Sequence, residues 1–106
     1  MRQLTPHQVK ALLDEPEAAP LLLDVREPGE FAFCHIDGSL HIPMGEIVSR
    51  LGELDPDRTT VVVCHHGMRS FQVARFLETQ GFGRVINLAG GIDAWAREAD
   101  PGMPRY

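Results

Sequence analysis

Two patterns of apolar and polar residues alternate along the chain. Short segments of strand-like composition occupy residues 21–25, 39–42, 59–64 and 84–88. Short apolar runs of this kind, bounded by turn residues, are typical of strands buried on both faces of a sheet. Between them, apolar residues recur at helical spacing. Strands and helices in alternation predict an α/β protein with a parallel sheet covered by helices on both sides.

The helical segments are marked by caps and breakers as well as by spacing. In the first, Thr5 is a good cap, Pro6 suits the first helical position and Gln8 completes a capping box, while Pro16 stops the helix. The other helices are expected over residues 28–34, around Ile47, Val48, Leu51 and Leu54, over residues 70–80 with Gly81 as C-terminal cap, and over residues 91–98. The tail from Asp100 is expected to be irregular.

The strand at residues 59–64 delivers Cys64 into a short loop that ends at Arg69 and Ser70, where the next helix is expected. The N–H groups of such a loop and the helix dipole concentrate partial positive charge. This setting favours the thiolate, which is the nucleophilic form of cysteine. Reactive loops of parallel sheets lie at the carboxyl ends of strands. We therefore predict Cys64 to be a catalytic nucleophile.

Length, charge and cysteine content narrow the function classes. The 106 residues suit one domain, residues 1–106, and 10 basic against 15 acidic residues give a net charge of −5 at pH 7. This balance argues against non-specific nucleic-acid binding, which needs a basic face. No apolar run approaches the about 18 residues of a membrane span, and the N-terminus lacks the apolar core of a signal peptide. Two cysteines make no disulfide framework, so we expect a cytoplasmic protein.

Three sequence blocks follow one another over nearly the whole chain. The first block runs from LLDVREP at residues 22–28 through Glu30-Phe31, His35-Ile36 and Gly38 to Ile42-Pro43. The second block is CHHGMRS at residues 64–70. The third block consists of NLAGGI at residues 87–92 and Ala94-Trp95. In this order and spacing the chain resembles the single-domain rhodaneses, or thiosulfate sulfurtransferase-like domains. The resemblance implies a three-layer α/β/α fold around a mainly parallel five-stranded sheet. It also implies an active-site cysteine that carries sulfur as a persulfide.

We therefore expect a sulfurtransferase in which Cys64 takes sulfane sulfur from thiosulfate or a persulfide and passes it to a thiol or to cyanide. The loop residues expected to bind the donor are His65, His66, Gly67, Met68, Arg69 and Ser70. The N–H groups of residues 65–69 are expected to surround the persulfide and the anionic part of the donor. Arg69 is expected to grip a sulfonate or stabilise the loop, and Ser70 to cap the helix or donate to Cys64. No metal or organic cofactor is required, and a sulfur-relay protein is a further expected partner.

Two positions depart from the family pattern. Cys34 stands where glycine is common, and we expect it to pack among neighbouring aromatic residues rather than to react. In the loop, two histidines and a methionine stand where many thiosulfate-using members have basic residues. The identity of the donor therefore stays open.

Two alternative functions also stay open. Cysteine phosphatases and arsenate reductases combine a cysteine, an amide cradle and an arginine, but they place five residues between cysteine and arginine. Here four residues separate Cys64 from Arg69. The shorter loop predicts a tighter pocket that suits one sulfur atom better than a phosphoryl group. The other alternative is a sulfur carrier that accepts and hands on persulfide sulfur without turnover of its own.

Several polar residues are interpreted as structural. Asp24 and Arg26, at the end of a strand, are expected to tie loops together. The cysteine–histidine neighbours at residues 34–35 and 64–66 lack zinc-finger spacing, and adjacent side chains diverge in an extended chain, so no metal site is expected. Gly90-Gly91 is expected to turn the chain into the last helix, close to the reactive loop.

Overall fold

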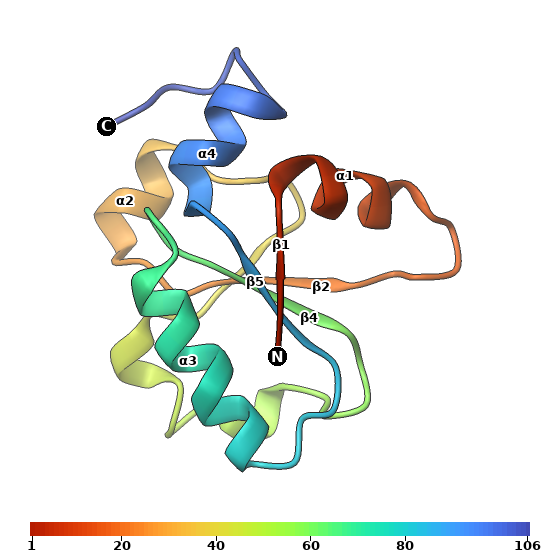
Figure 1. The fold of residues 1–106 in the computed structure, drawn as a ribbon. Coiled ribbons are helices and arrows are strands. Elements are labelled where there is room, and N and C mark those ends of the chain that lie inside the picture. The colour runs from red at the N-terminus through yellow and green to blue at the C-terminus, as the bar shows by residue number, and fades with distance from the viewer.

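A five-stranded parallel sheet forms the middle layer of the protein (Figure 1). The computed structural model describes all 106 residues. The strands are β1 (Arg2–Leu4), β2 (Leu21–Asp24), β3 (Leu40–His41), β4 (Thr60–Val63) and β5 (Val85–Leu88). They lie in the order β1-β5-β4-β2-β3, and every neighbouring pair is parallel. The predicted α/β class with a parallel five-stranded sheet is confirmed.

Helices pack on both faces of this sheet (Figure 1). They are α1 (Pro6–Asp14), α2 (Pro28–Phe33), α3 (Met68–Thr79) and α4 (Gly91–Glu98), together with the 3₁₀ helices η1 (Met44–Glu46) and η2 (Leu51–Glu53). The predicted capping box of α1 is present, with Thr5 and Gln8 each accepting a hydrogen bond from the other's backbone N–H. Helix α4 has the predicted bounds. Helix α3 begins two residues earlier than predicted, because Gly67 in the left-handed conformation serves as its N-cap.

The central strand β4 shows how the sequence pattern builds two apolar cores. Val61 and Val63 belong to the core that includes residues of α1 and α4. Val62 and Cys64 belong to the opposite core, which includes residues of α3. Successive side chains of a strand point to opposite faces, so a continuous apolar run fills both layers. Cys64 therefore lies just beyond the end of the central strand, on the α3 face.

The predicted helix around Ile47, Val48, Leu51 and Leu54 is wrong. This segment forms η1, a turn and η2, and the Val48 side chain is 72% exposed. Most of the hydrogen bonds here close short i→i+3 turns, such as Ile47 N–H to the Met44 carbonyl. Each 3₁₀ helix contains a glycine, which weakens a continuous α-helix. The apolar residues at helical spacing therefore do not form an α-helix, although Ile47 and Leu54 are buried in the core.

Strand β1 was not predicted from the residue pattern. It is an edge strand of three residues, paired with β5 from Arg2↔Ile86 to Leu4↔Leu88, and only Leu4 is buried. Such a strand has no apolar run to reveal it. Its position matters because it brings Gln3 beside Asn87, at the end of the sheet where the reactive loop lies.

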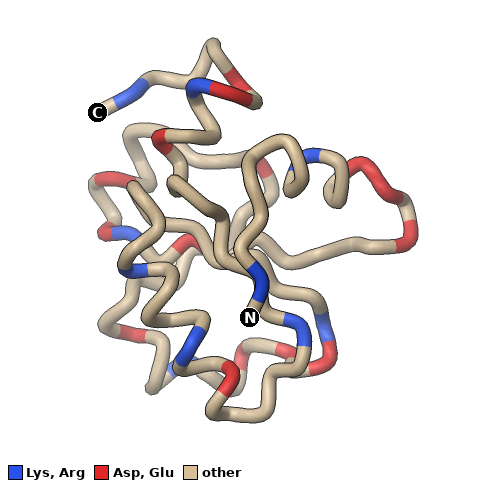
Figure 2. Tube along the Cα trace, viewed as in Figure 1, with Lys and Arg blue, Asp and Glu red and all other residues tan.

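Basic and acidic residues are interspersed along the chain trace (Figure 2). None of the helices is both long enough and apolar enough to cross a lipid bilayer.

Candidate active site

Cys64 lies at the carboxyl end of β4 with its side chain enclosed by the following loop. The residue is 1% exposed. Its Sγ accepts a hydrogen bond from the Gly67 N–H at 3.1 Å and lies 3.2 Å from the Ser70 Oγ. The sulfur therefore has polar contacts from both ends of the loop, although it is surrounded by the apolar core on its other side.

The backbone N–H groups of residues 65–70 form the electropositive part of the site. Only the Gly67 N–H has an acceptor within the protein, and that acceptor is the Cys64 sulfur. Three of the others belong to the first turn of α3, whose N–H groups have no intrahelical partner. Consecutive free N–H groups at a helix N-terminus favour an anion. Free N–H groups therefore follow Cys64 along the loop, and their binding of a donor stays a prediction.

Helix α4 orients this loop from the other side. The Ile92 N–H donates to the Cys64 carbonyl at 2.8 Å, and the Asp93 N–H donates to the His65 carbonyl at 3.1 Å. Gly91 has a φ of +62°, and a Cβ there would lie 2.5 Å from the Cys64 carbonyl oxygen and closer still to that of His65. Only glycine permits this approach. The prediction that Gly90-Gly91 turns the chain close to the reactive loop is confirmed.

A buried hydrogen-bond network links Ser70, which contacts the Cys64 sulfur, to Asn87 of β5. The Ser70 hydroxyl donates to Asn87 Oδ1 at 2.5 Å, and Asn87 Nδ2 donates to Gln3 Oε1 at 2.9 Å and to the Gly67 carbonyl at 3.1 Å. Because Ser70 has one proton and gives it to Asn87, its oxygen faces Cys64 as an acceptor for the thiol proton.

This geometry corrects the expected role of Ser70 and adds Asn87 to the site. Ser70 contacts Cys64, but it does not cap α3, since Gly67 is the N-cap, and its hydroxyl proton is donated to Asn87 and not to Cys64. The sequence did not single out Asn87 as a site residue. A polar residue inside an apolar strand could have indicated it, and its side chain is buried and hydrogen-bonded.

Arg69 is held by Glu30 of α2. Its guanidinium donates to both carboxylate oxygens, at 2.7 and 2.9 Å. This hydrogen-bonded pair lowers the pKa of Glu30 to about 2 and raises the pKa of Arg69. Tyr106 completes the group by donating its hydroxyl to Glu30 at 2.8 Å, and burial raises the Tyr106 pKa to about 12. Neither Glu30 nor Tyr106 was predicted near the site, because only the fold brings them there.

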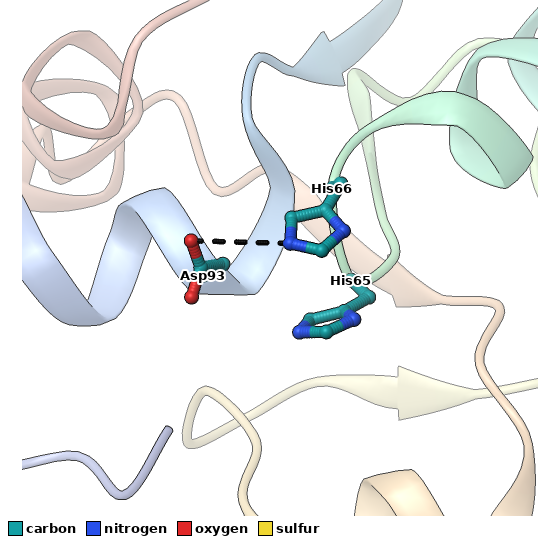
Figure 3. A group of neighbouring side chains, drawn as sticks. All are labelled: His65, His66 and Asp93. Carbon is teal, nitrogen blue, oxygen red and sulfur yellow. Dashed lines mark ion pairs between the residues drawn. The ribbon is translucent and has the colours of Figure 1, made fainter. Parts of the chain in front are cut away.

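His65 and His66 lie at the edge of the loop with Asp93 (Figure 3). The two imidazole rings stack with centroids 3.9 Å apart, so the expected divergence of adjacent side chains is wrong here. The chain at this point is a bend and not extended strand. The His65 ring also stacks on Tyr106 at 3.9 Å, and its Nε2 contacts the Tyr106 carbonyl at 2.9 Å.

The ligand atoms of His65, His66 and Asp93 lie within 4.8 Å of one another, so this group could hold a metal ion. However, the Asp93 carboxylate already pairs with Arg105 at 3.1 Å and with Arg97 at 3.5 Å, and these charges lower its pKa. A cation would have to displace both guanidinium groups. We therefore interpret the stacked histidines and Asp93 as a packed border of the loop and not as a metal site.

The remaining predicted donor-binding residue, Met68, is the first residue of α3, and it is 74% exposed. Behind the loop, Asp24 and Arg26 form the predicted structural pair, with the shortest contact at 2.7 Å and both side chains buried. The Arg26 guanidinium also donates to the Cys34 carbonyl at 2.6 Å. Cys34 is buried as expected and lies in the core opposite Cys64.

Residues 5–98 match the family described as the rhodanese-like domain. A sulfurtransferase of Allochromatium vinosum is 47% identical over 81 residues, which cover 76% of each protein. The thiosulfate sulfurtransferase GlpE of Actinobacillus pleuropneumoniae is 33% identical over 99 residues, covering 93% of this chain and 90% of the relative. The crystal structure of a rhodanese-like domain protein from Staphylococcus aureus is similar with a TM-score of 0.86 at 30% identity, over 100% of this chain and 99% of that one.

Proposed function

We propose that this chain, which belongs to the rhodanese-like domain family, transfers sulfane sulfur through a persulfide formed on Cys64. Its relatives include proteins named sulfurtransferase, which supports sulfur transfer in general. The observation that carries the specific proposal is the position of the Cys64 sulfur within a loop whose N–H groups, apart from that of Gly67, have no protein acceptor.

The proposed reaction has two half-reactions. The Cys64 thiolate attacks the sulfane sulfur of the donor, and the bond between that sulfur and the rest of the donor breaks. The electron pair leaves with the donor remainder, which is a thiolate from a persulfide or sulfite from thiosulfate. An acceptor thiolate or cyanide then attacks the outer sulfur of the persulfide, and Cys64 leaves again as a thiolate.

The loop supplies what each half-reaction needs. Cys64 is attacking group in the first step and leaving group in the second, so negative charge develops on the cysteine and on the transferred sulfur. The N–H groups of residues 65–70 and the N-terminus of α3 stabilise this charge without reorganising. The Ser70 hydroxyl, held by Asn87, contacts the Cys64 sulfur and fixes its direction.

The burial of Cys64 limits what can react. With the residue 1% exposed, a donor reaches the sulfur only by presenting a small terminal atom through the loop. A sulfane sulfur at the end of a donor fits this requirement. The four-residue spacing between Cys64 and Arg69 supports the same choice over a phosphoryl group.

Mass spectrometry after incubation with thiosulfate and with glutathione persulfide tests the proposal. We expect the wild type to gain one sulfur atom on Cys64 and to lose it on addition of cyanide. Cys64→Ser should gain none, while Cys34→Ser, which removes the other buried cysteine, should behave as the wild type. Absence of the adduct with every donor, or its persistence in Cys64→Ser, would overturn the proposal.

The same proteins separate the two alternatives. A carrier would form the persulfide once but would not turn over donor and cyanide continuously. A phosphatase would hydrolyse p-nitrophenyl phosphate in the wild type and not in Cys64→Ser. We expect continuous turnover with cyanide and no phosphatase activity.

A further inference from the structure

We infer that the preferred donor is a persulfide of the form R–S–SH and not thiosulfate, and that Glu30 is the residue that sets this preference. The inference rests on the proposed function, since it concerns which donor supplies sulfur to Cys64. The evidence for this donor preference is the set of ion pairs around the loop.

The one arginine in the reactive loop is not free to bind an anionic donor. Arg69 gives one N–H of each terminal nitrogen to Glu30, in a planar two-bond pair of 2.7 and 2.9 Å. Glu30 is in turn fixed by the Tyr106 hydroxyl at 2.8 Å and by its own capping contact, in which its Oε1 accepts from the Glu27 N–H at 3.0 Å. A bidentate pair of this kind satisfies both charges within the protein.

The other arginines at this end of the sheet also contact carboxylates, although Arg97 and Arg105 are half exposed and each makes a single contact. Arg26 is buried against Asp24. Arg97 and Arg105 both contact the Asp93 carboxylate, which also faces His66 at 4.0 Å. Each guanidinium around the loop therefore already has a carboxylate partner.

Charge distinguishes the two donors at such a site. Thiosulfate carries two negative charges and approaches a thiolate, so three charges meet at the loop before sulfite leaves. The persulfide group of R–S–SH brings no charge to the loop in its protonated form and one when ionised, the charges of R lie away from the reacting sulfur, and the donor remainder leaves as RS⁻. Backbone N–H groups carry only partial charges, which serve the sulfur bound at Cys64 but do not replace a free cation for a sulfonate.

Aromatic rings beside the loop can contact the organic part of a donor. The rings of His65, His66 and Tyr106 stack in succession at 3.9 Å beside the loop. These groups offer contact area to the organic part of a thiol persulfide.

Steady-state kinetics with both donors and cyanide as acceptor test the inference. We expect the wild type to show a higher kcat/KM for glutathione persulfide than for thiosulfate. Glu30→Gln keeps the size of the side chain but removes the charge that holds Arg69. This variant should raise kcat/KM for thiosulfate, relative to the persulfide, by about tenfold, as expected for one charged hydrogen bond gained by the sulfonate.

Two further variants separate donor choice from a general effect. Glu53→Gln removes the same charge from an exposed bidentate pair with Arg50, remote from the loop, and should leave both donors unchanged. Glu30→Asp keeps a carboxylate near Arg69 and should retain the preference of the wild type. Circular dichroism and thermal melting of each variant establish that it is folded.

Each outcome has a defined meaning. Equal use of both donors by the wild type, or an equal fall with both donors in folded Glu30→Gln, would overturn the inference while leaving the Cys64 persulfide intact. Failure of the wild type to form a persulfide with any donor would overturn the proposed function itself. A rise with thiosulfate in Glu53→Gln would assign the effect to net charge and not to Glu30.

Discussion

At the scale of single residues, the site depends on close approaches that few side chains permit. Gly91 lets the start of α4 touch the carbonyls of Cys64 and His65. Gly67, with a φ of +99°, turns its N–H toward the Cys64 sulfur and its carbonyl toward Asn87. Together these glycines orient the peptide groups on both sides of the nucleophile.

Gly91→Ala should disrupt the loop. The added Cβ meets backbone atoms at a positive φ, so we expect a loss of about 2–4 kcal/mol in the free energy of unfolding and a slower formation of the Cys64 persulfide. Urea denaturation and mass spectrometry measure the two effects. Gly52→Ala is the matched control, because a Cβ there meets nothing within 4 Å. Equal stability of the two variants would contradict this account of Gly91.

At the scale of elements, the helices and the strand around the loop hold it in addition to the hydrogen bond from Gly67 to Cys64. Helix α4 binds its carbonyls, and helix α2 binds Arg69 through Glu30. Strand β5 supplies Asn87 to the start of α3. Each contact joins segments far apart in the sequence, so the loop is ordered only when the layers have packed.

The link between α2 and α3 should depend on pH in the acid range. The folded protein lowers the pKa of Glu30 from 4.5 to about 2, so its charged form stabilises the fold above pH 4.5 and this contribution is lost as the pH falls toward 2. Since solvent partly screens the pair, we expect Glu30→Gln to be less stable than the wild type by about 1 kcal/mol at pH 7.

Urea denaturation from pH 7 to pH 3 checks this expectation. The difference between the wild type and Glu30→Gln should be constant down to about pH 5 and should shrink below it. A difference that grows on acidification would show that the ion pair is not its source.

At the scale of the whole molecule, Arg26 connects the layers behind the active site. Its guanidinium bonds Asp24 at the end of β2, the carbonyls of Glu30 and Cys34, and the Tyr106 hydroxyl. Arg26 is fully buried. The central sheet, helix α2 and the C-terminal segment thus share one buried cation.

Arg26→Met should be among the most damaging single substitutions. It leaves the Asp24 carboxylate buried without its partner, which costs about 3–5 kcal/mol in comparable cases. That is a large part of the about 5–15 kcal/mol by which a domain is stable. Arg50→Met breaks an exposed pair and should leave the urea midpoint unchanged. A midpoint for Arg26→Met close to that of Arg50→Met would contradict the structural role of Arg26.

Several features of the fold and site followed from the sequence because they are encoded locally. The apolar run before Cys64, the capping box at Thr5 and Gln8, and the glycines that start α4 each act over a few residues. The segment around Val48 shows the limit of this reasoning, since Ile47 and Leu54 are buried while Val48 is exposed, and no α-helix forms. Strand β1 was missed because its pairing with β5, and not its composition, defines it.

The sequence alone determined the α/β alternation, the position of Cys64 at the end of a buried strand, and the chain of N–H groups that follows it. These depend on hydrophobic period and on backbone geometry within one segment. Only the tertiary structure decided that Glu30 accepts the hydrogen bonds of Arg69 and that Asn87 accepts the proton of Ser70. The stacking of Tyr106 on His65 likewise depends on the fold. Those contacts join residues up to 41 positions apart, and packing of the layers brings them together.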